Sequence, residues 1–146
     1  MPNIAVIDAG PLIAIFNNRD AYHSQIRESI KTFRSQYGRL TTTWPVVSEA
    51  VYMLHVYASL KAQSGLLQWI VDGYLEIFEL QREHVERILI LQEKYANSSM
   101  QFADGSLVVV AEEMKTNNIF SSDFQDFAIY RIFQKQPFQN LMKKIE

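Results

Sequence analysis

The sequence has no cysteine among its 146 residues, which excludes disulfides, thiolate metal sites and cysteine nucleophiles. It also has no apolar stretch that approaches membrane-spanning length. The first residues include a short apolar run, but an aspartate interrupts it too early for a secretory signal peptide. These absences lead us to expect a soluble, cytoplasmic protein without a membrane partner.

An excess of positive charge is missing as well, since the formal net charge is −2. A protein that binds nucleic acid through general electrostatic attraction would be basic. Any nucleic-acid function of this chain must therefore use a local basic patch or a bound cation.

Several catalytic and phosphate-binding motifs are also missing. The sequence contains no glycine-rich Walker loop, no GxGxxG pattern and no GxSxG nucleophile elbow. The opening apolar run and Asp8 also suggest a haloacid dehalogenase-like phosphatase. Those enzymes need a second aspartate two residues later, and Gly10 stands at that position.

The hydrophobic content of 48% is sufficient for a core, and the length suits one domain over residues 1–146. Short apolar runs alternate with amphipathic segments, which predicts an α/β fold with a mainly parallel sheet. We expect strands over 3–8, 39–42, 75–80 and 119–123. We expect helices over 10–16, 20–37 with Gly38 as its stop, from Thr43 onward, over 64–73 with Ser64 as its cap, and over 82–96 and 104–116.

Four acidic residues occupy comparable positions along these elements. Asp8 and Asp123 follow strands, Asp104 begins a helix, and Glu49 lies in the first two turns of another. Each could be a helix cap or a turn residue. In parallel sheets, however, ligands bind beyond the carboxyl ends of the strands, where these residues would meet.

A converged group of four carboxylates would repel itself strongly. Two like charges 4 Å apart cost about 4 kcal/mol at an effective dielectric constant near 20. Such a cluster needs a divalent cation or raised carboxylate pKa values. Oxygen ligands without histidine or cysteine favour Mg²⁺ or Mn²⁺, which commonly serve phosphate chemistry.

Four stretches of the sequence resemble the PIN-domain ribonucleases, and in particular the VapC-type toxins of toxin–antitoxin systems. They are AVIDAGPLIAIF (5–16), VVSEAVYML (46–54), FADGSLVVVAEE (102–113) and IFSSDFQDFAIYR (119–131). The resemblance implies a three-layer α/β/α sandwich and Mg²⁺- or Mn²⁺-dependent hydrolysis of RNA phosphodiester bonds. It also implies an antitoxin protein as a partner.

The resemblance also assigns roles to particular residues. The family's catalytic and metal-binding acids fall on Asp8, Glu49, Asp104 and Asp123. The family's polar residue before the last acid falls on Ser121, a candidate contact of the scissile phosphate, and Asp126 matches a further acid that some members carry. Apart from the resemblance, Arg131 follows the last acidic motif closely and is either a second phosphate contact or an ordinary surface arginine. Many members carry another aspartate three residues before the Asp104 position, where this chain has Gln101, so one candidate ligand is missing.

Three further features each allow two interpretations. Arg27, Lys31 and Arg34 recur along one helix, either as a solvated face or as a track for an RNA backbone. Leu66, Leu67, Trp69 and Ile70 lie either in the core or at the interface of an expected homodimer. The whole chain, finally, is either an active nuclease or a PIN-fold module that binds RNA or protein with weak or no activity.

Overall fold

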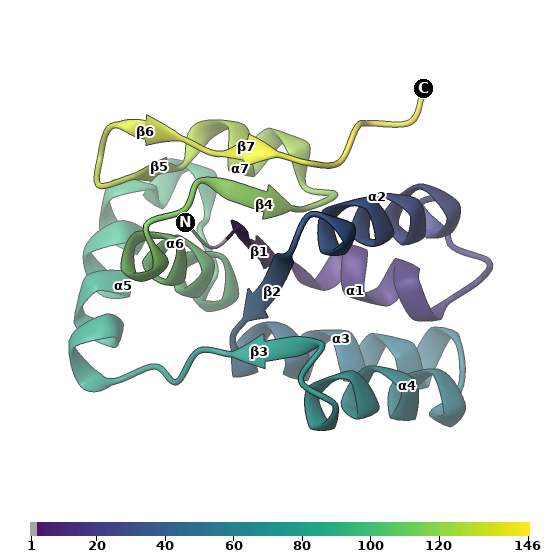
Figure 1. Ribbon diagram of the computed structural model, residues 1–146. Coiled ribbons are helices and arrows are strands. Elements are labelled where there is room, and N and C mark those ends of the chain that lie inside the picture. The colour runs from purple at the N-terminus through teal and green to yellow at the C-terminus, as the bar shows by residue number, and fades with distance from the viewer. Residues whose placement is uncertain (1–2) are drawn as a thin grey trace.

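A five-stranded sheet in the order β3–β2–β1–β4–β7 forms the centre of the computed structural model, which describes residues 3–146 (Figure 1). Every pair of neighbouring strands in it runs parallel, as the sequence predicts. The strands are β1 (Asn3–Ile7), β2 (Gly38–Thr42), β3 (Leu75–Ile77), β4 (Asn118–Phe120) and β7 (Gln139–Asn140).

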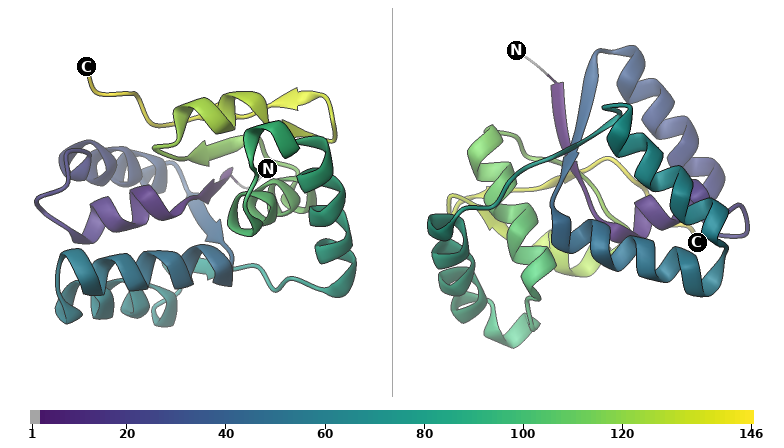
Figure 2. Two further views of the ribbon diagram at one scale, coloured as in Figure 1. Left: turned by 180° about the vertical axis from the view of Figure 1, so that it is seen from behind. Right: turned by 90° about the horizontal axis from the view of Figure 1, so that it is seen from below.

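Helices cover both faces of this sheet, which confirms the expected three-layer α/β/α sandwich. Figures 1 and 2 show four helices on one side: α1 (Ala9–Phe16), α2 (His23–Ser35), α3 (Trp44–Tyr57) and α4 (Leu60–Val71). On the other side lie α5 (Arg82–Lys94) and α6 (Phe102–Met114). A 3-10 turn, η1 (Ala96–Ser98), α7 (Phe124–Ile129) and a small antiparallel sheet of β5 (Arg131–Ile132) and β6 (Gln136–Pro137) complete the described elements.

The core lies on both faces of β1 and around α6. The side chains of β1 from Ile4 to Ile7 are all buried, because a central parallel strand is covered from both sides. Helix α6 is buried from Gly105 to Glu112, since it packs against both β1 and α5. A Cβ atom at Gly105 would lie 2.8 Å from Cγ2 of Ile88, so this glycine permits the close approach of α5 and α6.

The structure corrects several predicted boundaries. Helix α4 begins earlier than expected, because the hydroxyl of Ser59, and not that of Ser64, accepts the capping hydrogen bond from the Ala62 amide. Helix α2 ends at Ser35, and the left-handed residue after it is Tyr37 (φ 61°) rather than Gly38, which starts β2. The sequence also missed the helix and strands after residue 123, which are too short for a periodic signal.

The strand register decides which residues meet at the carboxyl edge of the sheet. Val6 and Ile7 of β1 pair with Ile119 and Phe120 of β4. The amide of Asp8 continues this ladder by donating to the Phe120 carbonyl over 2.9 Å. Asp8 therefore lies beside the first residues after β4.

No helix within residues 3–146 is long and apolar enough to span a membrane.

Candidate functional site

Two of the four acids are N-terminal caps of helices. Asp8 caps α1, and its Oδ1 accepts from the Ala9 amide over 2.8 Å. Asp123 caps α7, and its Oδ1 accepts from the Asp126 amide over 3.2 Å. Because helix N-termini carry partial positive charge, these positions stabilise negative charge. Asp8 and Asp123 thus both have the capping role that the sequence allows. As caps of helices that follow β1 and β4, both carboxylates lie at the same edge of the sheet.

The other two acids also lie near helix starts. Asp104 is in the first turn of α6, where its Oδ2 accepts from the amide of Gln101, the N-cap residue, over 3.2 Å. The hydroxyl of Tyr130 stands 3.5 Å from the same oxygen. Glu49 is in the second turn of α3 and is exposed. Helix α6 begins at Phe102, so the expectation that Asp104 opens the helix is off by two residues.

The electrostatics show that these acids are close enough to influence one another. Burial raises the pKa of Asp8 to about 7, against the hydrogen bonds from Ala9 and Ser121 that lower it. The charges of Asp104 and Glu49 contribute smaller parts of this rise in the pKa of Asp8. A carboxylate with this pKa is poorly compensated by the protein around it. The site therefore favours a positive partner.

The pKa values of the neighbouring acids shift in the same direction. Burial raises the pKa of Glu49, and the charge of Asp104 raises it further. Burial also raises the pKa of Asp104, to which the charge of Asp123 adds. At Asp126, burial and then Asp123 raise the pKa. Negative charge has thus accumulated at this edge of the sheet beyond what the fold neutralises.

Ser121 connects two of the acids. Its hydroxyl donates to Oδ2 of Asp8 over 3.0 Å and accepts from the amide of Asp123 over 3.0 Å. Its backbone is held in turn by Asn140 of β7, which accepts from the Ser121 amide and donates to its carbonyl. The Ser121 side chain is fully buried, so it holds Asp8 in position. Its predicted contact with a phosphate stays a prediction.

We expect Ser121→Ala to lower stability by about 1–2 kcal/mol, because the Asp123 amide and Asp8 each lose a buried partner. The RNA cleavage that the family resemblance implies should also fall by about 10–100-fold, as when other supporting hydrogen bonds of catalytic ligands are removed. Thermal unfolding and a cleavage assay measure the two effects. Ser121→Thr is the matched control, since it keeps the hydroxyl, and equal activity of the alanine variant would contradict the positioning role.

The residues present are suited to a hard divalent cation. Asp8 uses one lone pair of each carboxylate oxygen in the bonds to Ala9 and Ser121, so one on each oxygen is left for a ligand. Within residues 3–146, no three acidic or histidine side chains stand close enough to form a complete cage for a metal ion. Mg²⁺ seldom requires such a cage, because it keeps several waters and uses one or two carboxylates together with phosphate oxygens.

Other residues noted in the sequence have structural contacts. Nη1 of Arg131 donates to the carbonyls of Ala128, Ile129 and Tyr130 at the end of α7, and its predicted phosphate contact stays a prediction. The guanidinium of Arg34 lies 4.3 Å from the ring centre of Tyr74, and the expected RNA track of Arg27, Lys31 and Arg34 stays a prediction. In α4, Leu66 is buried in the core and Leu67 is exposed.

Sequence reasoning missed two residues that support the acids. Nothing in the residues around Tyr130 indicates that its hydroxyl would approach Asp104. Asn140 lies in a two-residue strand and carries no local signal that it would hold Ser121. Both contacts depend on the path of the chain after α7.

Comparisons with known proteins agree with this architecture. A family model described as PIN domain matches residues 5–131. Ribonuclease VapC26 of Mycobacterium tuberculosis is 25% identical over 126 residues, which are 86% of this chain and 91% of the relative.

Two solved structures share the fold. One is Mycobacterium tuberculosis VapC20, described as a sarcin-ricin loop cleaving toxin, with a TM-score of 0.71 and 16% identity over 85% of this chain and 94% of the other. The second is VapBC2 from Rickettsia felis bound to a DNA fragment from its promoter. Its TM-score is 0.69, with 10% identity over 94% of this chain and 98% of the other.

Proposed function

The chain belongs to the PIN domain family, and from this premise we propose that it is an endoribonuclease that uses Mg²⁺ or Mn²⁺ to hydrolyse RNA phosphodiester bonds. The observation that carries the proposal is the raised pKa of Asp8 beside Asp104 and Glu49. A fold gains nothing in stability from such a cluster. A divalent cation would be held by these carboxylates and would supply positive charge for a phosphate.

The proposed chemistry divides the work among the four acids. Asp8 and Asp104 would hold the metal, and Asp123 and Glu49 would add negative charge around it or orient a water. When bound, the metal supplies a water of lowered pKa and stabilises negative charge on the phosphate in the transition state. Glu49 is exposed and has a raised pKa, so it accepts a proton from an attacking water more readily than an ordinary glutamate does.

The resemblance to VapC proteins supports a wider set of proposals. The relative is named a ribonuclease VapC, and one structural neighbour is a VapBC complex. We propose that this chain is the toxin of a toxin–antitoxin pair, held by an antitoxin protein, and that residues 1–146 form one domain in the cytoplasm. The exposed Leu60, Leu67 and Val71 of α4 support a homodimer.

A second candidate function is that of a PIN-fold module that binds RNA or protein with weak or no nuclease activity. Gln101 favours it, because an amide replaces the carboxylate that many relatives carry there. The side chain of Gln101 donates to the Ser99 carbonyl over 3.3 Å, so it has a local structural contact.

The two functions predict different responses to a chelator. We expect the purified protein to cleave RNA with Mn²⁺ or Mg²⁺ and to lose cleavage in EDTA, since the acids alone repel the phosphate. Restoration by added Mn²⁺ is the control for irreversible damage. Cleavage gels on a mixed RNA panel measure the result. A protein that binds RNA equally with and without EDTA, and cleaves none of it, would favour the binding module.

A further inference from the structure

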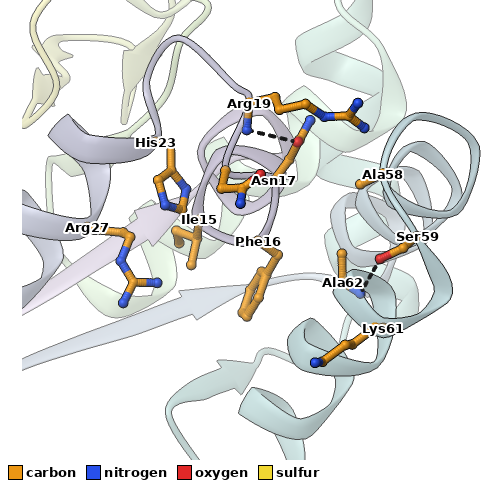
Figure 3. A pocket seen from close by; sticks show the side chains of 11 residues that line it. Ile15, Phe16, Asn17, Arg19, His23, Arg27, Ala58, Ser59, Lys61 and Ala62 are labelled. Atoms are coloured by element: carbon orange, nitrogen blue, oxygen red, sulfur yellow. Dashed lines mark hydrogen bonds between the residues drawn. The ribbon is translucent and has the colours of Figure 1, made fainter.

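A hollow of about 600 Å³ lies at the opposite end of α1 from Asp8 (Figure 3). Its walls come from the end of α1 and the turn after it, the first turns of α2, and the junction of α3 with α4. We call it the cationic cavity, because Arg19, Arg27 and Lys61 line it and no acidic residue does. Its volume is within the range of ligand-binding sites.

The three cations of this cavity have no acidic partner. The ion pairs among residues 3–146 are Arg39–Glu76, His84–Glu113 and Arg87–Glu112, and none includes a cation of the cavity. Asp20, the nearest acid in sequence to Arg19, accepts a hydrogen bond from the Tyr22 amide over 2.9 Å and forms no ion pair with Arg19. The chain as a whole is acidic, so three uncompensated cations from separate elements form a local positive patch.

Free guanidinium donors and a helix start add to the positive character of this cavity. Arg19 donates one hydrogen bond to the Tyr57 carbonyl through Nη2 and keeps its other donors. The start of α4, capped by Ser59, contributes the positive end of a helix dipole. The chemistry therefore suits a phosphate or another compact anion.

A second hollow of about 380 Å³ lies beside this cavity and shares Asn17 with it. Its lining includes the acid Asp20, and it extends to Gly10 and Ser122, which neighbour Asp8 and Ser121 in the sequence. Tyr22 and Tyr57 also line the second hollow, and 62% of the Tyr57 side chain is exposed. Aromatic faces between a cationic site and a catalytic site suit bases of a single strand. The eight residues of α1 separate the two ends by about 12 Å.

We propose that the cationic cavity binds a backbone phosphate of the RNA strand a few nucleotides from the bond that is cleaved. This proposal rests on the proposed nuclease function. One strand lying along α1 places the scissile phosphate at Asp8 and a flanking phosphate at Arg27 and Lys61. The cavity is thereby the local basic patch that an acidic RNA-binding protein requires.

The test measures RNA binding by the full-length Asp8→Asn protein, in which cleavage is suppressed. A fluorescent single-stranded RNA is titrated at several salt concentrations against this protein and against the same protein with Arg27→Gln and Lys61→Gln. Both positions are exposed, so the fold is retained. We expect Kd to rise about tenfold or more, because charged hydrogen bonds are lost, and the slope of log Kd against log salt to fall by about 0.7 for each lost phosphate contact.

A phosphate walk makes the assignment specific. Single phosphates of the RNA are replaced in turn by neutral methylphosphonates. At one position we expect a large loss of affinity for the protein with the intact cavity, and no further loss for the double variant. Arg82→Gln is the matched control, because Arg82 is an exposed cation on α5, and it leaves the slope unchanged.

Two outcomes would overturn the proposal. In the first, the slope of log Kd against log salt is unchanged in the double variant, while the wild type cleaves RNA. The cavity then does not bind RNA, and the nuclease function still holds. A parallel titration uses a polyglutamate peptide in place of the RNA. If the double variant loses binding to this peptide while its RNA binding is unchanged, the cavity binds an acidic protein segment and not RNA. Conversely, a wild type that cleaves no RNA but shows the phosphate-specific loss refutes the nuclease function and keeps the cavity as an RNA site.

Discussion

Asp8→Asn is expected to reduce RNA cleavage by about 10²–10³-fold or more while the fold stays intact. The substitution removes the most deeply placed negative charge of the cluster, and with it the strongest attraction for a divalent cation. Loss of one electrostatic contact that acts in the transition state typically costs this much. The rate of cleavage at saturating Mn²⁺, compared with the wild type, measures the effect.

The amide of asparagine is a close match for the carboxylate that it replaces. Its oxygen can still accept from the Ala9 amide, so the cap of α1 is retained. Asp72→Asn is the matched control, because Asp72 is an exposed carboxylate at the end of α4. Full cleavage activity in Asp8→Asn, with a normal circular dichroism spectrum, would refute the assignment of Asp8 to the catalytic centre.

The same substitution is expected to stabilise the metal-free protein at neutral pH. The pKa of Asp8 is raised in the folded state from its ordinary value of 3.8 to about 7. The folded state therefore holds the proton more tightly than the unfolded state, and wild-type stability declines as pH rises from about 4 through 7. Since each pKa unit corresponds to about 1.4 kcal/mol, the penalty above pH 7 approaches about 4 kcal/mol.

Asparagine escapes most of this penalty but loses some hydrogen bonding. The Ser121 hydroxyl donates to Oδ2 of Asp8 in the wild type. In Asp8→Asn this hydroxyl must find another acceptor or face the NH₂ group of the asparagine side chain. We therefore expect a net gain of about 2–3 kcal/mol above pH 7, which declines as pH falls through 7 and is lost toward pH 4, where the unfolded state also begins to bind the proton.

Urea unfolding in EDTA across pH 4–8 measures the difference between Asp8→Asn and the wild type. Added Mn²⁺ should then stabilise the wild type and leave the variant nearly unchanged, because only the wild type offers the charged ligand. A variant that is less stable than the wild type at pH 8, or a difference in stability that does not depend on pH, would contradict the raised pKa of Asp8.

The positions of the four acids could be predicted because each has a local signature. Asp8 follows a buried run in sequence, and Asp104 precedes an apolar helix, so neighbours within a few residues define their settings. The parallel α/β fold was predictable for the same reason, since β1 is continuously apolar and α2 is periodic. In the sequence alone, however, Asp8 is either a helix cap or a ligand. Its hydrogen bond from Ser121 and the effect of the Asp104 charge on its pKa make both roles compatible in one residue.

The cationic cavity had only a partial signal in the sequence. In the sequence, Arg27 groups with Lys31 and Arg34 because the three share one helix. This grouping leaves out Arg19 and Lys61, which line the cavity with Arg27. Tertiary structure turns Arg34 to Tyr74 and brings Arg27 together with Arg19 and Lys61 from other elements. No periodicity relates these three positions.

By itself, the amino-acid sequence determined the succession of strands and helices up to residue 123, the acids that lie near the starts of several helices, and the family resemblance. These depend on side-chain patterns over a few residues, which local backbone preferences and burial enforce. Only the tertiary structure decided that β4 ends beside Asp8, that Asn140 holds Ser121, and that three distant cations line one hollow. Such contacts arise when the packing of the whole chain brings remote segments together, because long-range pairing is set by the shared core and not by the residues that meet.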